Sequence, residues 1–103
     1  MGDVNVSSDA RLKSNIISLG STLSRLLLID GKSYTAINDG KQKIGVLAQD
    51  IQKVFPELVG TDDNQMLTVN YQGLVPVLIN AIKEQDNKIE RLESLVEQLI
   101  NNK

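Results

Sequence analysis

Hydroxyls, carboxylates and lysines are the side chains in this chain that could carry out chemistry, because it contains neither histidine nor cysteine. The lack of histidine removes the commonest general base, the usual Ser-His and Cys-His pairs and the commonest transition-metal ligand. The lack of cysteine removes disulfides and thiolate metal sites. Any catalysis therefore has to rest on a hydroxyl, a carboxylate or a lysine that works without those partners.

Asp62 and Asp63 are adjacent carboxylates, a side-chain type that binds cations. No further ligands follow them at the spacing of a calcium loop. We interpret the pair as an acidic, solvated turn, and the sequence predicts no metal site and no cofactor. The net charge of −2, without a basic stretch or an aromatic cluster, gives nucleic-acid binding little support. No apolar run approaches the length of a membrane span, so we expect no membrane partner.

The elements that have to position any site are clearest in the last third of the chain, where apolar residues recur at alternating spacings of three and four. This heptad pattern predicts a helix over about 74–101, roughly 40 Å long at about 1.5 Å per residue. The rest of the 103-residue chain would cover only part of such a rod, so we predict an oligomer. Its contact line, called here the heptad seam, consists of Val75, Leu78, Ile82, Gln85, Ile89, Leu92, Val96 and Leu99.

Shorter elements precede this helix, and they predict an α+β fold: a small mixed body with short β-hairpins and two helices, followed by a long C-terminal helix that forms a trimeric coiled-coil-like stalk. Asp39-Gly40 is a hairpin turn signal. Pro56 ends a helix before it, and Pro76 favours a start of the long helix near 73 rather than 70. The predicted elements are a helix over about 16–27, strands over 33–37 and 41–45, a helix over 46–55, strands over 58–59 and 66–69, and the long helix.

Three stretches of the sequence together resemble one family, the C-terminal intramolecular chaperone of phage tailspikes, endosialidases and tail fibres, also called the S74 self-cleaving peptidase domain. Ser8-Asp9-Ala10-Arg11-Leu12-Lys13 is similar to the family's opening Ser-Asp-x-Arg-x-Lys. Ile-Gly-Val-Leu-Ala-Gln-Asp-Ile at 44–51, with Val-Phe-Pro-Glu-Leu-Val at 54–59, resembles its Gly-x-x-Ala-Gln-(Glu/Asp) helix. Leu-Thr-Val-Asn-Tyr at 67–71 and the helix start at 74–84 are similar to the segment before the family's coiled-coil end.

The resemblance implies a domain that brings three chains together, registers the upstream fibre or spike segment of the same polypeptide, and then cuts itself off. The implied catalytic pair is Ser8 and Lys13, the implied cut lies between Ser7 and Ser8, and Asp9 and Arg11 are supporting residues. Residues 1–7 would be the remnant of the upstream segment. Residues 8–103 would be the chaperone and autoprotease domain, with a globular part at 8–70 and the helix at 71–103. It would act in the host cytoplasm during virion assembly and leave the mature fibre after the cut.

The implied chemistry sets two conditions. A serine becomes a useful nucleophile when a base takes its proton, and a lysine base needs its ordinary pKa of about 10.4 lowered by roughly three units. We expect burial at an assembled interface to supply most of that shift, with Arg11 as a cationic neighbour. Residues five apart lie on opposite faces of a strand and about 140° apart on a helix. Either the chain bends between Ser8 and Lys13, or the lysine comes from a neighbouring subunit.

The oligomeric state and the function each retain alternatives. β-branched residues at a with leucine at d favour a parallel dimer, whereas the resemblance implies the homotrimer that we predict. Gln85 at d and apolar residues at flanking positions (Leu74, Ile79, Ala81, Leu95 and Ile100) support more than two strands. The alternative functions are a non-cleaving trimerisation module and the receptor-binding tip of a fibre, although one Phe, two Tyr and no Trp offer little aromatic surface for a sugar.

Overall fold

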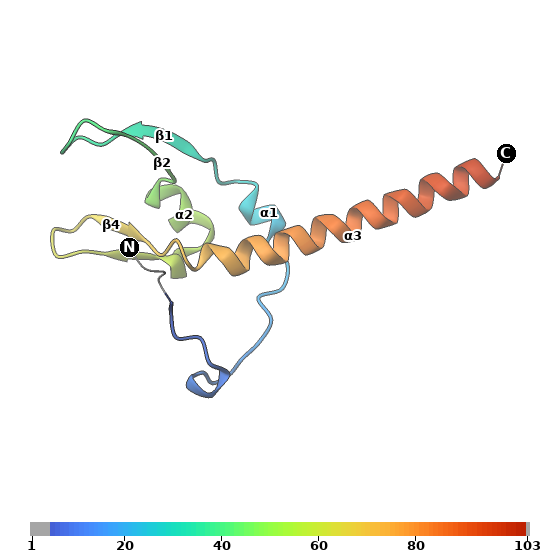
Figure 1. The fold of residues 1–103 in the computed structure, drawn as a ribbon, viewed down its shortest axis with the longest axis horizontal. Helices are drawn as coiled ribbons and strands as arrows, with labels where there is room; N and C mark the ends of the chain where they lie inside the picture. Colours follow the sequence, from blue (N-terminus) through green and yellow to red (C-terminus); the bar gives the residue numbers. More distant parts are fainter. Residues whose placement is uncertain (1–4, 103) are drawn as a thin grey trace.

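The computed structural model describes residues 5–102 and shows a small α+β body at one end of a long helix that projects away from it (Figure 1). The molecule measures 65 × 40 × 32 Å. The predicted α+β fold class with a long C-terminal helix is therefore confirmed, and the trimeric form of the stalk stays a prediction. Residues 1–4 of the predicted upstream remnant and residue 103 lie outside the described range. The elements are two 3-10 helices, η1 (Ala10–Leu12) and η2 (Pro56–Leu58), three α-helices, α1 (Leu23–Leu26), α2 (Ala48–Val54) and α3 (Leu74–Asn101), and four strands, β1 (Lys32–Thr35), β2 (Gln42–Gly45), β3 (Val59–Thr61) and β4 (Leu67–Val69).

The two prolines mark helix boundaries where the sequence predicts them. α3 begins at Leu74, so Pro76 lies in its first turn, where backbone N–H groups have no partner within the helix and a missing one costs little. α2 ends at Val54, and Pro56 is the first residue of η2. The late start of α3 and the end of the second helix before Pro56 are therefore confirmed.

The helix predicted over 16–27 is wrong for most of its length, because only α1, Leu23–Leu26, is helical. Asn15 and Gly20 adopt left-handed backbone angles, with φ of 53° and 73°, which a right-handed helix cannot include. The Ser18 hydroxyl accepts a hydrogen bond from the Gly20 N–H (3.1 Å), a local bond that competes with helix formation. The apolar spacing that predicted the helix belongs to a segment without regular secondary structure, whose Ile16 is exposed.

The four strands form two separate antiparallel hairpins. β1 pairs with β2, with Lys32 opposite Gly45, and the connecting turn uses Gly40 at a φ of 70°, where glycine carries no steric penalty. β3 pairs with β4, with Val59 opposite Val69. The strands lie close to their predicted ranges, because turn residues and alternating polarity are signals that act within a few residues.

The core is small and lies where α2 and the start of α3 meet. Ile51 and Phe55 are fully buried, and Val77 is nearly so. The Arg25 guanidinium lies 4.5 Å from the centroid of the Phe55 ring and donates a hydrogen bond to the Val54 carbonyl (3.3 Å). This cation–π contact joins α1 to the end of α2.

A close approach between β2 and the start of α3 requires glycine at position 45. A Cβ there would lie 2.7 Å from the Tyr71 hydroxyl and 3.3 Å from a ring carbon of Tyr34. The same Tyr71 hydroxyl accepts a hydrogen bond from the Val46 N–H (3.1 Å). The first hairpin is thereby attached to the segment that leads into α3.

Candidate functional site

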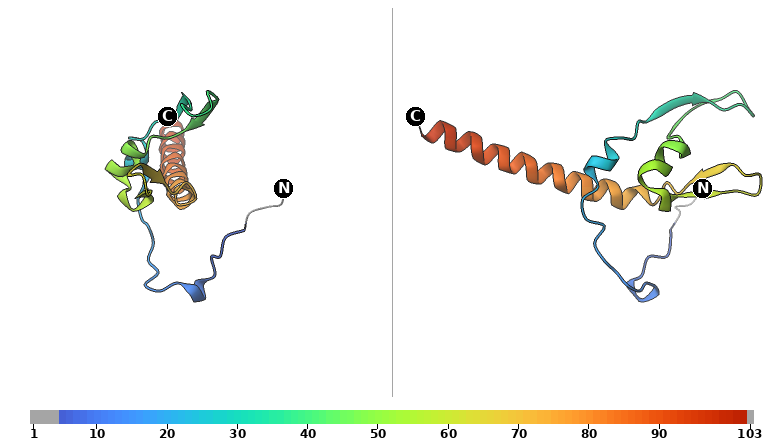
Figure 2. Two further views of the ribbon diagram at one scale, coloured as in Figure 1. Left: turned by 90° about the vertical axis from the view of Figure 1, so that its left-hand side faces the viewer. Right: turned by 180° about the vertical axis from the view of Figure 1, so that it is seen from behind.

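The N-terminal arm, defined here as residues 5–19, stands off the body in every view (Figures 1 and 2). All of its residues are exposed, and η1, its one regular element, contains no buried residue. The arm holds Ser8 and Lys13, together with the exposed apolar side chains of Leu12, Ile16 and Ile17. The segment that the resemblance singles out is therefore open to solvent and to neighbouring chains.

Ser8 and Lys13 meet in this arm because the chain bends at η1. Lys13 Nζ donates a hydrogen bond of 2.8 Å to Ser8 Oγ, between residues five apart. The bend is closed by backbone bonds from the Leu12 N–H to the Asp9 carbonyl and from the Lys13 N–H to the Ala10 carbonyl, each 3.0 Å. Of the two alternatives left open by the spacing, the single chain adopts the one in which its own backbone turns.

Asp9 and Arg11 bond to each other, and these bonds stabilise the bend at η1. The Asp9 carboxylate accepts from the Arg11 N–H (2.9 Å) and from the Arg11 guanidinium (2.8 Å between Oδ2 and Nη2). The guanidinium bond first, and the backbone bond second, lower the pKa of Asp9 below its usual value, and the same side-chain bond raises the pKa of Arg11. The positive charge of Arg11 is therefore engaged by Asp9, and Asp9 orients the backbone of the turn.

α3 presents two different faces. Val77 and Ala81, each 2% exposed, point into the body, whereas the apolar residues of the heptad seam range from 44% exposed at Leu78 to 69% at Leu99. Gln85 of the seam is exposed as well. The body of the chain thus occupies one side of the first turns of α3 and leaves each apolar residue of the seam at least 44% exposed.

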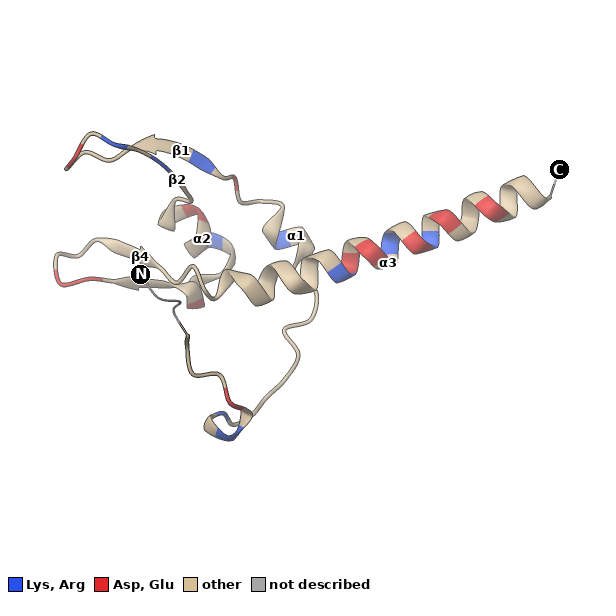
Figure 3. Cartoon of the chain, viewed as in Figure 1, with Lys and Arg blue, Asp and Glu red and all other residues tan. Residues whose placement is uncertain are grey.

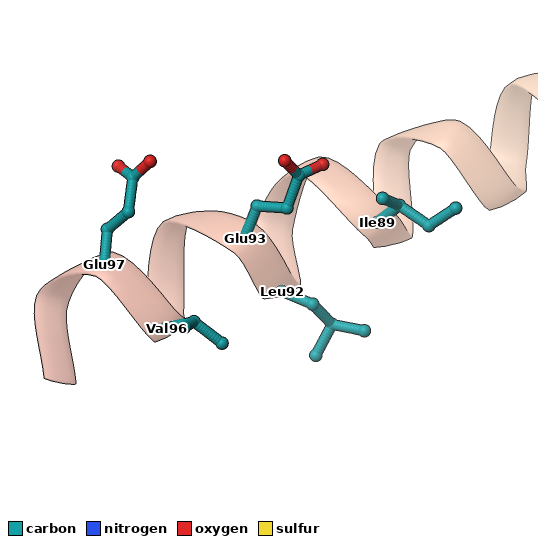
Figure 4. A pocket seen from close by; sticks show the side chains of 5 residues that line it. All are labelled: Ile89, Leu92, Glu93, Val96 and Glu97. Carbon is teal, nitrogen blue, oxygen red and sulfur yellow. The ribbon is translucent and has the colours of Figure 1, made fainter. Parts of the chain in front are cut away.

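Beyond the body, the seam is an apolar stripe bordered by charge. The helix carries no charged residue before Lys83 and many after it (Figure 3). Leu92 and Val96 point to one side of the helix, while Glu93 and Glu97 point to another (Figure 4). An apolar stripe with charged flanks is typical of a helix that packs against other helices in a coiled coil.

A polar junction between the base of the arm and α3 was not predicted. Glu84 Oε1 accepts from the backbone N–H groups of Thr22 and Leu23, the latter at 3.0 Å. The buried Thr22 hydroxyl donates to the Val77 carbonyl (2.7 Å), and Asn80 Nδ2 donates to the Gly20 carbonyl (2.9 Å). These partners lie 55 to 62 residues apart in sequence, so no local pattern indicates them.

The Asp62-Asp63 pair lies in the turn between β3 and β4. Asp62 Oδ1 accepts from the backbone N–H groups of Asn64 (2.8 Å) and Met66 (3.0 Å), so this carboxylate stabilises the turn. Within residues 5–102, no group of three or more candidate ligands is arranged to hold a metal ion. In the same part of the chain, none of the helices is long and apolar enough to cross a membrane.

Comparison with known proteins gives consistent findings. Residues 8–60 match the Peptidase S74 family, described as the chaperone of endosialidase. The long tail fibre protein Gp37 of Enterobacteria phage K3 is 32% identical over 101 residues, which cover 89% of this chain and 8% of that protein. Gp37 of Escherichia phage AR1 is 33% identical over 92 residues (80% and 8%), and Gp37 of Enterobacteria phage M1 is 31% identical over 102 residues (89% and 41%). The chain therefore spans between 8% and 41% of the length of these relatives. Because the family match covers more than half of its length, the chain belongs to the chaperone of endosialidase family.

Proposed function

We propose that this chain is an assembly chaperone of a phage tail fibre, which gathers three copies and then releases itself by one cut between Ser7 and Ser8. The observation that carries the proposal is the 2.8 Å contact between Lys13 Nζ and Ser8 Oγ on an exposed arm. Two further findings support it: the family match begins at Ser8, and the relatives are named long tail fibre proteins.

The heptad seam supports the gathering step. Its apolar side chains are exposed along the whole of α3, and burial of such surface is the main driving force of association. The flanking residues Ile79, Leu95 and Ile100 are also about half exposed or more, which widens the apolar stripe beyond what two strands cover. Gln85 is a polar residue of the kind that sets register at a cost in stability. A parallel homotrimer is the assembly that we propose.

The cut follows from attack by a side chain on the peptide bond that precedes it. The neutral Lys13 amine takes the proton of the Ser8 hydroxyl, and Ser8 Oγ attacks the carbonyl carbon of Ser7 through a five-membered ring. The C–N bond breaks, the Ser8 nitrogen takes up a proton and becomes a free amine, and the Ser7 acyl group is left as an ester on Ser8 Oγ. Water hydrolyses the ester, which yields the Ser7 carboxylate and restores the Ser8 hydroxyl.

Assembly would then control the timing of the cut. In the single chain both Ser8 and Lys13 are exposed to water. Burial of a lysine favours the neutral form that can act as a base. A neighbouring copy that covers Leu12, Ile16 and Ile17 of the arm would also remove water from the pair. Cleavage would therefore follow trimer formation.

The test is the intact mass of the chain with a marker protein fused in front of residue 5. We expect the parent to lose the marker by a cut before Ser8, and Ser8→Ala to keep it. Ser7→Ala is the matched control, because it alters the neighbouring serine and keeps the carbonyl that is attacked, so it should still be cut. A full-length mass in the parent, under conditions where it is trimeric, would contradict the proposed self-cleavage.

A non-cleaving trimerisation module is the second candidate. The observation that favours it is the exposure of both Ser8 and Lys13 in the single chain, where the pair is open to water. In that case the parent and Ser8→Ala would both sediment as trimers and both stay full length. The same mass experiment therefore separates the two functions.

A further inference from the structure

The base of the arm is held by long-range polar contacts. Residues 20–23, where the arm joins the body, contact α3 through the Glu84 carboxylate, the Val77 carbonyl and the Asn80 amide. Thr22 lies at the centre of this junction and is fully buried, although it is a polar residue. The arm itself shows no such anchoring, because its residues are all exposed. The position of the arm is therefore set where it meets α3.

Glu84 has a particular part in this junction. Thr22 precedes α1 and would be expected to cap it, but its hydroxyl donates to the Val77 carbonyl and makes no capping bond. The first N–H groups of α1 still need acceptors. Glu84 accepts from the backbone N–H groups of Thr22 and Leu23, the cap residue and the first residue of α1, so α3 supplies an acceptor at the start of this helix. Glu84 is half-buried, and its carboxylate links both the base of the arm and α1 to α3.

The junction lies at the level of the heptad seam but on the outer side of α3. Glu84 comes two residues after Ile82 and one before Gln85, at heptad position c, which faces away from the seam. From Gly20 to Lys13 the chain reaches at most about 25 Å when fully extended. Packed helices lie about 8–10 Å apart. A junction fixed on the outer side of α3 therefore keeps the Ser8–Lys13 pair within reach of a neighbouring copy in an assembled seam.

The geometry points to Glu84 as a positioning residue for self-cleavage: by fixing the base of the arm to α3, it holds the Ser8–Lys13 pair where a neighbouring copy can cover it. This inference rests on the proposed self-cleavage. Glu84 does not touch the reacting atoms and acts through Thr22 and Leu23. Because it lies off the heptad seam, its removal leaves the trimer intact and slows the cut.

The experiment compares the rate of marker release from the fused parent with the rates from fused Glu84→Ala, Glu84→Gln and Glu90→Ala. Sedimentation first shows that each protein is trimeric, and circular dichroism shows that each is folded at the assay temperature. Glu84→Ala should be slower by on the order of ten- to a hundredfold, as expected when reacting groups are misplaced. Glu84→Gln keeps an oxygen acceptor and should recover most of the rate. Glu90→Ala makes the same change elsewhere on α3 and should match the parent.

The outcomes distinguish this inference from the proposed function. If the parent is cut and trimeric Glu84→Ala is cut at the same rate, the positioning role is overturned and self-cleavage stands. If the parent is not cut, both are overturned. Should Glu84→Ala fail to fold, Asn80→Ala replaces it, because it removes the bond to the Gly20 carbonyl and places a good helix former in α3. A parental rate for folded, trimeric Asn80→Ala would then count against the inference.

Discussion

At the residue scale, Ser8 and Lys13 face each other across one short turn of backbone, and the lysine is the donor in their hydrogen bond. For the proposed self-cleavage, the amine would act as the base toward Ser8 Oγ. Bonds between Asp9 and Arg11 stabilise the turn. They lower the pKa of Asp9 and raise the pKa of Arg11. The arrangement provides proximity, and the proposed self-cleavage would also need a neighbouring copy to exclude water from the pair.

The role of Lys13 as a base leads to a prediction at this scale. Lys13→Arg keeps a positive donor near Ser8 but cannot supply a neutral amine, because arginine stays charged. We expect the fused variant to be cut at least about a hundredfold more slowly than the parent, which is the size of a lost general-base contribution. The measurement is the fraction of full-length mass against time. Cleavage of Lys13→Arg at the parental rate would show that the lysine only donates to Ser8.

At the scale of elements, four-residue α1 depends on contacts from elsewhere in the chain. Glu84 of α3 accepts a hydrogen bond from the N–H of its first residue, Leu23, and Arg25 lies against the Phe55 ring at the end of α2. A helix of one turn is not stable alone, because nucleation fixes several residues for a single hydrogen bond. α1 is thus a product of its tertiary neighbours.

The Glu84 contacts predict how stability depends on pH. The backbone N–H groups of Leu23 first, and of Thr22 second, with a smaller contribution from Lys88, lower the pKa of Glu84 below its ordinary 4.5. A lowered folded-state pKa adds stability that is fully present above 4.5 and is lost as the pH falls through the lowered value. We therefore expect urea unfolding to show the parent more stable than Glu84→Gln at pH 7, with the difference shrinking below pH 4.5. A difference that stays constant down to pH 3 would contradict a role for the charge.

At the scale of the whole molecule, apolar surface is divided unequally between the body and α3. Ile51, Phe55 and Val77 form a small core, while the seam leaves residues such as Ile82 and Leu99 more than half exposed. A domain of this size buries a limited part of its surface alone, and oligomerisation is a common remedy. The stability of the protein is expected to depend on its concentration.

A charge in the seam should separate the copies. Ile89→Asp places a carboxylate in the apolar interface, where an unpaired charge is costly to bury. Asn87→Asp is the matched control, because it adds the same charge on the same helix outside the seam. By sedimentation we expect the parent and Asn87→Asp at three times the chain mass of 11.3 kDa, and Ile89→Asp at the mass of one chain. An Ile89→Asp trimer would show that copies meet through another surface, and a parent at twice the chain mass would favour the dimer.

The sequence by itself determined those features whose causes are local. The heptad spacing predicted a helix over about 74–101, which is the observed range of α3. The two prolines predicted the start of α3 and the end of α2, and turn signals such as Asp39-Gly40 located the hairpins. The order of three short motifs indicated the family that the later comparison shows. Each of these signals acts over a few residues, through backbone sterics or the period of a helix or strand.

The tertiary structure alone decided how the arm is placed. The segment over 16–22 has the apolar spacing of a helix, yet it has no regular secondary structure. Asn15 and Gly20 turn the chain, and its apolar side chains are exposed rather than packed on the body. The bend that joins Ser8 to Lys13 and the junction of Thr22 with Glu84 also follow from the path of the chain. Thr22 and Glu84 are 62 residues apart, and packing of the whole body brings them together. Neither the residue types nor their spacing in the sequence predicts this contact.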